Sequence, residues 1–576
     1  MASQPRRGMT SECDSLRLSR MLLKTGAGTL LAAGLCLALR GNNLAVLFFR
    51  TQDLAILIAG ASLLLLLSWR LPALAPIRVK PAFVVVAAAL FALLAAWLGT
   101  WLVFGGYALT RDEICADFDS LILATGRLYE AIPPEWQGYS HALMPRFMLP
   151  LSPEVGWLSA YLPGNAALRA LGQLSIGTQW INPLLAALSA GALYRIGLRL
   201  WPGAKGTALI PVLLLVSSAQ FLTMAMTSYA MAAHLAVNLL WLWCFLRNDK
   251  RGDAGAILFG FLGTGLHQLL FHPLFAFPFL AQLWFAGQRR RALLYLAAYA
   301  LIGLFWASYW QIVLAGTDAG AGAAGGSGGL SFLIARVLTQ LQAIDLAGFG
   351  LMALNLARFV SWQNILLLPL ALLAWPLIRR GEGVARPLAG GILLTLLAMA
   401  ILLPWQGHGW GYRYLHGCIG SFCLLAGYGW KALADGPAAA RLRGALAAGT
   451  LVSLALILPW HLRQAHDFVA PYRAAYAAIR ASPAEIVLVD DAGLLFAEDL
   501  VRNAPDLSNR PKIVYVVSLP APQLAALCRS FRVERFGVRE GLAFGIPPGG
   551  EPDLARAAML DRLNCGPPVA TPRVGR

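Results

Sequence analysis

Long apolar stretches constrain this chain more than any other feature of its sequence. Residues 22–39, 54–69 and 82–104 carry a single charged residue between them, Lys24. Each stretch approaches or reaches the roughly 20 residues that a helix needs to cross the hydrocarbon layer of a membrane. Lipid offers the backbone no hydrogen bonds, so a segment that crosses it folds as a helix. The sequence therefore predicts a polytopic α-helical membrane protein.

The basic residues indicate how the chain is threaded. The net charge is +18, but Lys and Arg occur in small groups between the apolar stretches, which indicates topology and argues against nucleic-acid binding. We expect about thirteen transmembrane helices in a bacterial inner membrane, with tail 1–20 in the cytoplasm and the C-terminus in the periplasm. All basic groups face the cytoplasm if the spans lie near 21–39, 53–69, 82–105, 171–198, 206–225, 227–246, 254–270, 271–286, 293–314, 363–378, 388–404, 413–430 and 443–460.

The long segments outside the expected spans all lie on the outer side, so function is sought there. Within the transmembrane domain, 21–460, the segments expected on this side are outer loops 106–165 and 315–362 and a shorter link, 405–417. Loop 106–165 is rich in Pro, Trp and Tyr, which predicts short surface helices between turns. Loop 315–362 opens with a Gly-rich tract that cannot hold regular structure.

The tail 461–576 differs in character from the rest of the chain. Residues 485–491 and 512–518 are predicted to be buried strands, and 493–502 and 521–531 helices, which together form a small α/β domain with parallel pairing. No Gly-x-Gly-x-x-Gly follows either strand, so dinucleotide binding has no support. Cys528 and Cys565 are the only cysteines in this tail, and we predict a disulfide between them in the oxidising periplasm.

Two adjacent carboxylates, Asp112 and Glu113, follow the third expected span. A carboxylate at this position acts as a general base if an acceptor hydroxyl is held within hydrogen-bond reach. The alternative is a solvated helix start, where acidic residues interact favourably with the positive end of the helix dipole. Residue type alone leaves both interpretations open.

The position of this pair resembles a known family. An apolar span followed at once by Asp112 and Glu113, a loop of surface helices, further spans to about residue 460 and an exported domain are together similar to membrane glycosyltransferases of the GT-C fold. The resemblance is to the branch of the protein O-mannosyltransferases and the lipid A aminoarabinose transferases, although two extra spans precede the pair here. It implies transfer of a sugar from a polyprenyl-phosphate donor to an acceptor at the outer face, with Asp112 as base and Glu113 supporting it.

Such a reaction also needs cations at the membrane surface, because charge grows on the leaving phosphate. Arg413, between Tyr412 and Tyr414, is the first choice for phosphate contact, since its guanidinium offers a fork for two oxygens. The alternative is an arginine that anchors a helix end at the headgroups. The remaining candidates are Arg111, Arg146, His408 and His416 for the phosphate, and Trp157 and Tyr161 for stacking on a sugar.

Other functions remain open at this stage. Many-spanned proteins are often transporters or flippases, although no internal repeat is evident here. A non-catalytic role in envelope assembly is a third possibility. The cysteines lack zinc-ligand spacing, whereas a divalent cation at the acidic residues of the first loop is left undecided. The expected partners are the lipid-linked donor, membrane lipid and an acceptor glycan, lipid or protein.

Overall fold

The computed structural model describes residues 6–571 apart from 42, 77–78, 145–146, 150, 152–154, 317–337, 340–345, 435 and 437. The chain divides into two compact units, which are described separately. The membrane unit comprises Met1–Gly99, Trp180–Ala307 and Gly328–Gln464. The loop-tail unit comprises Thr100–Gln179, Ser308–Ser327 and Ala465–Arg576, and therefore joins loop 106–165 to the tail.

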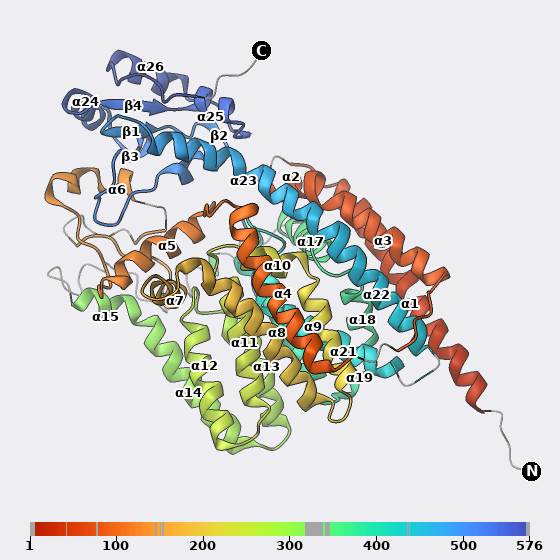
Figure 1. Cartoon of the computed structure of the whole chain (residues 1–576). Helices are drawn as coiled ribbons and strands as arrows, with labels where there is room; N and C mark the ends of the chain where they lie inside the picture. Colours follow the sequence, from red (N-terminus) through yellow and green to blue (C-terminus); the bar gives the residue numbers. More distant parts are fainter. Residues whose placement is uncertain are drawn as a thin grey trace, which may run out of the picture. The chain divides into compact units, whose positions relative to one another are not determined.

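The membrane unit is helical (Figure 1). Two of its helices, α4 and α23, continue into the loop-tail unit. Its elements, with η for a 3-10 or π turn, are α1 (Arg6–Leu37), α2 (Leu44–Phe48), η1 (Phe49–Asp53), α3 (Leu54–Trp69), α4 (Pro81–Leu102), η3 (Thr178–Trp180), α8 (Ile181–Leu200), α9 (Lys205–Val216), α10 (Ala219–Ala225), α11 (Met231–Phe245), α12 (Lys250–Thr264), α13 (Phe271–Phe285), α14 (Arg289–Ala307), α17 (Leu346–Ser361), α18 (Leu367–Leu373), α19 (Trp375–Arg380), α20 (Ala385–Leu402), η5 (Arg413–Cys418), α21 (Ile419–Ala434), α22 (Ala439–Val452), η6 (Ser453–Ile457) and α23 (Leu458–Arg480).

Among the described residues, seven helical runs are long and apolar enough to cross a membrane. An eighth is added if α9 and α10, which meet at a 63° bend, form one broken span. The chain is therefore a multi-pass membrane protein, whereas the total of about thirteen spans stays a prediction. The seven runs are Ser15–Leu37, Leu44–Trp69, Pro81–Leu102, Thr178–Leu200, Arg289–Ala307, Ala385–Leu402 and Ala439–Arg480.

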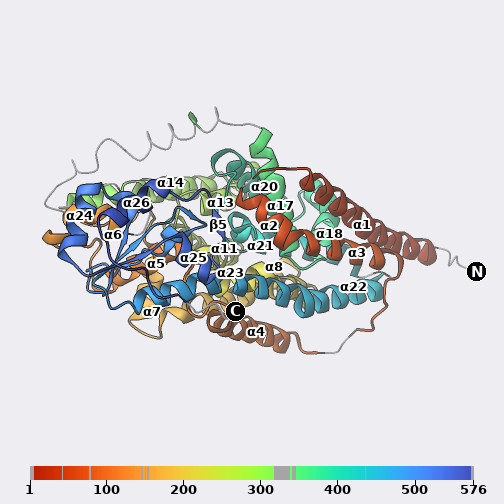
Figure 2. The ribbon, with the colours of Figure 1, turned by 90° about the horizontal axis from the view of Figure 1, so that it is seen from above.

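Small residues set the close packing of these helices. A side chain at Gly26 of α1 would meet the Ala61 carbonyl of α3 at 2.9 Å, so this glycine lets the two backbones approach. Both ribbon views show α1 and α3 side by side (Figures 1 and 2).

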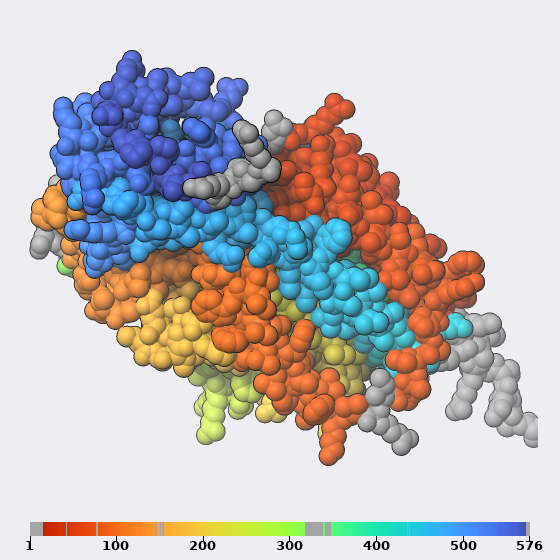
Figure 3. Space-filling view, turned by 45° about the horizontal axis from the view of Figure 1, so that its top comes forward, coloured from red at the N-terminus to blue at the C-terminus, as the bar shows by residue number. Residues whose placement is uncertain are grey.

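The run Ala439–Arg480 is visible as a continuous cyan and light-blue band in the space-filling view (Figure 3). Leu451 and Leu456 are among its exposed apolar side chains.

The loop-tail unit contains a three-stranded parallel sheet in the order β3-β1-β4, with Ile486 of β1 opposite Lys512 and Val533. The parallel pairing agrees with the sequence, but the helix expected over 493–502 is wrong: a short strand and a 3-10 turn replace it, and Phe496 adopts a left-handed φ of 54°. The elements are α5 (Arg111–Ala124), η2 (Pro134–Tyr139), α6 (Ser140–Leu143), α7 (Gly164–Gln173), α15 (Tyr309–Ala315), β1 (Ile486–Val489), β2 (Gly493–Leu494), η7 (Ala497–Leu500), β3 (Lys512–Tyr515), η8 (Val516–Ser518), α24 (Ala521–Ser530), β4 (Val533–Phe536), α25 (Val538–Phe544), β5 (Pro548–Gly549) and α26 (Leu554–Arg562).

One hydrophobic core serves both loop 106–165 and the tail. Phe118 and Ile122 of α5 belong to the same buried cluster as Ile486 of β1 and Leu524 of α24. The cluster also contains Cys565, whose sulfur is bonded to Cys528 at 2.07 Å, the pair expected from the sequence. Helix α5 is therefore supported by the sheet domain and by the residues around it in the loop.

Candidate functional site

The start of α5 separates the two adjacent carboxylates into different roles. Thr110 is the N-cap, and Glu113 folds back to form a capping box with it. The Oε2 atom of Glu113 accepts hydrogen bonds from the backbone N–H groups of Leu109 and Thr110, each at 3.2 Å, and the side chain is buried. Glu113 is thus used to begin the helix. Asp112 is only half-buried and is the carboxylate that remains near the surface.

Tyr161 holds the Asp112 carboxylate, because its hydroxyl donates a hydrogen bond to Oδ1 of Asp112. Tyr161 therefore orients the proposed base, which differs from the expected stacking on a sugar. Trp157 is 2% exposed and packs against Phe118, with ring centroids 5.7 Å apart. This burial in the core does not fit the predicted contact of Trp157 with a sugar ring.

Arg111 is bound by the tail. Its guanidinium pairs with Glu498 and with Asp499, at 3.0 Å from Nε to Oδ1 of Asp499. Burial raises the pKa of Asp499 to about 6, and the cationic charges of Arg111 and Arg502 oppose this shift. Two carboxylates already neutralise Arg111, so its geometry does not fit the predicted contact with a donor phosphate.

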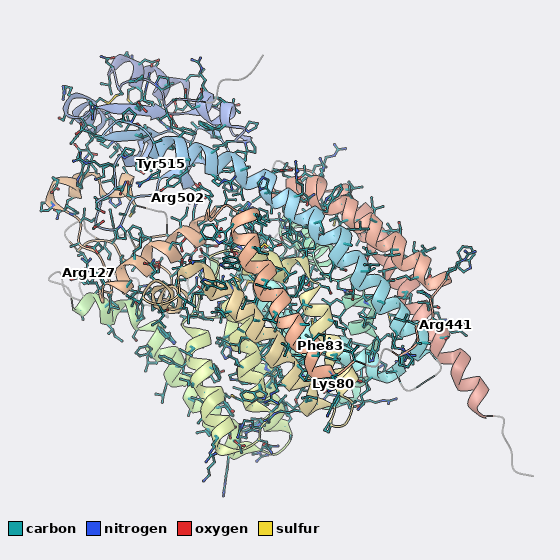
Figure 4. All side chains as sticks on the ribbon, in the orientation of Figure 1. Lys80, Phe83, Arg127, Arg441, Arg502 and Tyr515 are labelled. Carbon is teal, nitrogen blue, oxygen red and sulfur yellow. A yellow bond between two sulfur atoms is a disulfide. The ribbon has the colours of Figure 1, made fainter. Side chains whose placement is uncertain are left out.

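Arg502, labelled in Figure 4, also connects the tail to the loop. Its guanidinium lies 4.0 Å from the centroid of the Tyr107 ring and 5.2 Å from that of Tyr476, distances at which a cation is attracted to an aromatic face. Asn503 donates to the backbone oxygen of Leu143 at 2.7 Å. These contacts are long-range in sequence, and the residue pattern gave no signal for them.

A second carboxylate, Asp119, lies on α5 two helical turns after Asp112. Burial raises the pKa of Asp119 to about 7, and a hydrogen bond with Ser159 opposes the shift. Asp119 was not predicted as a site residue, because its environment is built by residues distant in the sequence. The spacing of seven residues, which places Asp112 and Asp119 on one side of a helix, was the available signal.

Replacing Asp119 with asparagine is expected to raise the melting temperature at pH 8 and to change it little at pH 4. The carboxyl ionises near pH 3.9 in an unfolded chain and about 7 in the fold. The folded state thus holds the extra proton, and stability falls as pH rises between these values. Thermal unfolding in detergent at several pH values measures the effect. Asp561→Asn, at an exposed carboxylate, is the control and is expected to show no gain in melting temperature that is confined to high pH.

Within the membrane unit, Arg413 is packed among polar and aromatic groups. Its Nη2 donates to the backbone oxygen of Gln406 at 2.6 Å, and its backbone N–H donates to the Gln406 side chain at 3.1 Å. The guanidinium lies over the rings of Tyr229 and Tyr414, 5.4 and 5.3 Å from their centroids. With 9% of its surface exposed, Arg413 is held in one orientation.

Several other residues of link 405–417 are also buried, although Trp405 is exposed. Tyr412 is fully buried and its carbonyl accepts from Gln220 at 2.9 Å, while the carbonyl of His408 accepts from Tyr229 at 3.1 Å. His416 is fully buried within η5. The structure thus brings the predicted Tyr412, Arg413, Tyr414, His408 and His416 into one compact segment. Arg146 and the Gly-rich tract from 317 onward lie outside the described residues.

A buried ion pair holds this link and was missed by sequence reasoning. Arg358 of α17 contacts Asp53 at 2.9 Å, and the two residues are 3% and 0% exposed. The same guanidinium donates to the carbonyls of Gly409 and Gly411 at 2.8 and 3.3 Å. A carboxylate inside an apolar region has a functional or structural partner by default, so Asp53 itself was the available signal.

Two further contacts hold Asp53, and a third holds its partner Arg358. Its Oδ1 atom accepts from the Ser361 hydroxyl and from the indole of Trp362, each at 2.9 Å, while Gln52 accepts from Arg358 at 3.1 Å. The carboxylate is therefore fully satisfied without water. Within the described residues, no group of three or more His, Cys, Asp or Glu side chains is arranged to hold a metal ion.

Comparisons with known proteins give distant structural similarity. No family model matches the sequence, and no curated protein matches it. ArnT from Cupriavidus metallidurans bound to undecaprenyl phosphate is 15% identical over 73% of this chain and 85% of that chain, with a TM-score of 0.45. The apo state of ArnT from the same organism is 14% identical over 84% of this chain and 91% of that chain, with a TM-score of 0.46. A third structure is the archaeal oligosaccharyltransferase AglB from Archaeoglobus fulgidus in complex with an inhibitory peptide and a dolichol-phosphate. It is 13% identical over 70% of this chain and 58% of that chain, with a TM-score of 0.42. Similarity at this level assigns no activity to the chain.

Proposed function

We propose that this membrane protein is a glycosyltransferase that moves a sugar from a polyprenyl-phosphate-linked donor to an acceptor at the periplasmic face. The observation that carries the proposal is the state of Asp112. It is a half-buried carboxylate at a helix start, oriented by the Tyr161 hydroxyl, while its neighbour Glu113 is fully engaged in the helix cap. A carboxylate so held is suited to accept a proton.

In the proposed reaction, Asp112 takes the proton of an acceptor hydroxyl, and the resulting oxygen attacks the anomeric carbon of the donor sugar. A new glycosidic bond forms as the bond from that carbon to the phosphate oxygen breaks. The polyprenyl phosphate leaves with the bonding electron pair. Arg413 is assigned to bind this phosphate, because its guanidinium places a positive charge in this segment. The cradle of Tyr229 and Tyr414 supports the assignment by limiting the orientations of Arg413.

Arg413→Gln is expected to weaken binding of a polyprenyl phosphate at least about tenfold, because one charge-assisted contact of this kind is lost. The affinity of Arg413→Lys is expected to lie between that of the unchanged protein and that of Arg413→Gln, since lysine keeps the charge but loses the planar fork. Titration of the purified protein with polyprenyl phosphate measures both. Arg289→Gln removes an exposed arginine elsewhere and serves as control. Unchanged affinity in Arg413→Gln would exclude this residue from the phosphate site.

The decisive experiment for the overall function is a transfer assay. The protein is reconstituted in liposomes with a polyprenyl-phosphate donor that carries a labelled sugar, and candidate glycan, lipid and peptide acceptors are added. Label that becomes covalently attached to an acceptor supports the glycosyltransferase. Label that crosses the bilayer still bound to its carrier identifies a flippase. If neither occurs with any donor, the assembly role becomes the better description.

A further inference from the structure

A cavity opens in the membrane unit where three spans end. Its volume is about 510 Å³, and it is lined by Ser19, Trp69, Arg70, Leu71, Pro72 and Arg441. Ser19 lies near the start of the run Ser15–Leu37, Trp69 ends the run Leu44–Trp69, and Arg441 is near the start of the run Ala439–Arg480. Figure 4 labels Arg441 at this end of α22. The cavity therefore lies at the ends of three apolar runs, where we expect hydrocarbon to give way to headgroups.

The charge of this cavity is positive. Arg70 and Arg441 are both exposed, and no lining residue is acidic. Among the described residues, neither arginine forms an ion pair with a carboxylate; Arg441 donates to the Ser15 hydroxyl at 3.1 Å, and Arg70 lies 5.1 Å from the Trp69 ring centroid. Two guanidinium groups with spare donors attract a phosphate and repel an ammonium group.

The wall of the cavity is fixed by hydrogen bonds. The backbone N–H of Leu74 donates to the carbonyl of Ala440 at 2.9 Å, and Arg443 donates from Nε to the carbonyl of Leu74 at 2.9 Å. Gly444 has no side chain where Pro72 approaches it, so α22 and the segment after α3 lie in direct backbone contact. The two arginines are thus presented by connected elements of one unit.

We propose that this cavity binds the headgroup of an anionic glycerophospholipid of the surrounding membrane. The phosphodiester is held by Arg70 and Arg441, the headgroup hydroxyls lie near Ser19, and the glycerol and first acyl carbons pack against Leu71 and Pro72. Basic pockets at the ends of membrane-spanning helices are suited to anionic headgroups. Phosphatidylcholine and phosphatidylethanolamine are disfavoured because each carries a cation that faces the two guanidinium groups. The site is separate from the proposed transferase residues and stands without them.

The test uses the full chain in nanodiscs that contain equal amounts of phosphatidylglycerol and phosphatidylcholine, followed by native mass spectrometry of the released protein. The unchanged protein is expected to retain phosphatidylglycerol in preference to phosphatidylcholine. The double variant Arg70→Gln/Arg441→Gln is expected to lose apparent affinity for phosphatidylglycerol by at least about tenfold. Arg289→Gln/Arg290→Gln removes the same charge at the start of α14 and is expected to keep the preference.

Three results would overturn the proposal. The first is equal retention of the two lipids by the unchanged protein, a comparison that needs no variant to fold. The second is an equal loss in both double variants, which would indicate net charge and no defined site. The third is displacement of the lipid by inorganic phosphate or glycerol phosphate at sub-millimolar concentration, which would indicate a site for soluble phosphates. Thermal unfolding of each variant confirms that the compared proteins are folded.

Discussion

Asp112→Asn is expected to reduce sugar transfer by about 10²- to 10⁴-fold, the contribution typical of a positioned general base. Asparagine has nearly the same shape and still accepts the hydrogen bond from Tyr161, so the fold is expected to be retained. The measurement is the initial rate of label transfer from a polyprenyl-phosphate donor in liposomes, with thermal unfolding as the check on folding. Full activity in this variant would refute the role assigned to Asp112.

Glu113→Gln is the matched control at the adjacent position. Glutamine also completes a capping box with Thr110, because its side-chain oxygen accepts from the same backbone N–H groups. Transfer is therefore expected to stay close to that of the unchanged protein. An equal loss in Asp112→Asn and Glu113→Gln would mean that the two carboxylates act together, as the family resemblance implies, and that capping is only part of the role of Glu113.

The second large effect is expected at the buried ion pair of the membrane unit. Arg358→Met is expected to destabilise the protein by about 3–5 kcal/mol, because it leaves the Asp53 carboxylate buried without its countercharge. It also removes the donors to the carbonyls of Gly409 and Gly411, which fix the link that carries Arg413. Thermal or denaturant unfolding in detergent measures the loss.

A double variant separates the contribution of the buried charges to stability from the contribution of Arg358 to holding the link 405–417. Asp53→Leu/Arg358→Met is expected to recover much of the lost stability, because apolar residues of similar size remove both buried charges. It is not expected to restore binding of a polyprenyl phosphate, since the two glycine carbonyls still lack their donors. Arg247→Gln, which breaks an exposed pair with Asp249, serves as control and is expected to change stability little. Equal losses of stability in the single and double variants would contradict the view that the unpaired buried charge causes the destabilisation.

Features that depend on local sequence were predictable. The strands at 486–489 and 512–515 follow from short runs of apolar residues. Residues 265–270 separate α12 from α13 and include the break predicted at 265–268 from the alternation of basic groups. The helix predicted at 521–531 is α24. Each of these depends on neighbouring residues, which is the information that hydrophobic patterning contains.

The candidate site combines local features with non-local ones. The spacing of Thr110 and Glu113 is that of a capping box, a local pattern that by itself assigns Glu113 to the helix start. The pairing of Arg111 with Asp499 is different, because 388 positions separate the two residues. Nothing local distinguishes an arginine that meets a tail carboxylate from one that meets a phosphate. The buried environment of Asp119 is non-local in the same way.

The core shared by α5 and the sheet domain has a consequence for how the protein is made. The apolar face of α5, with Phe118 and Ile122, is completed by residues that lie after position 485 in the chain. During synthesis, roughly 360 residues must emerge after α5 before the partners in the sheet domain exist, which takes tens of seconds at typical elongation rates. The segment bearing Asp112 thus matures last although it is translated early. Chains arrested before the sheet domain would expose this face to proteases and chaperones.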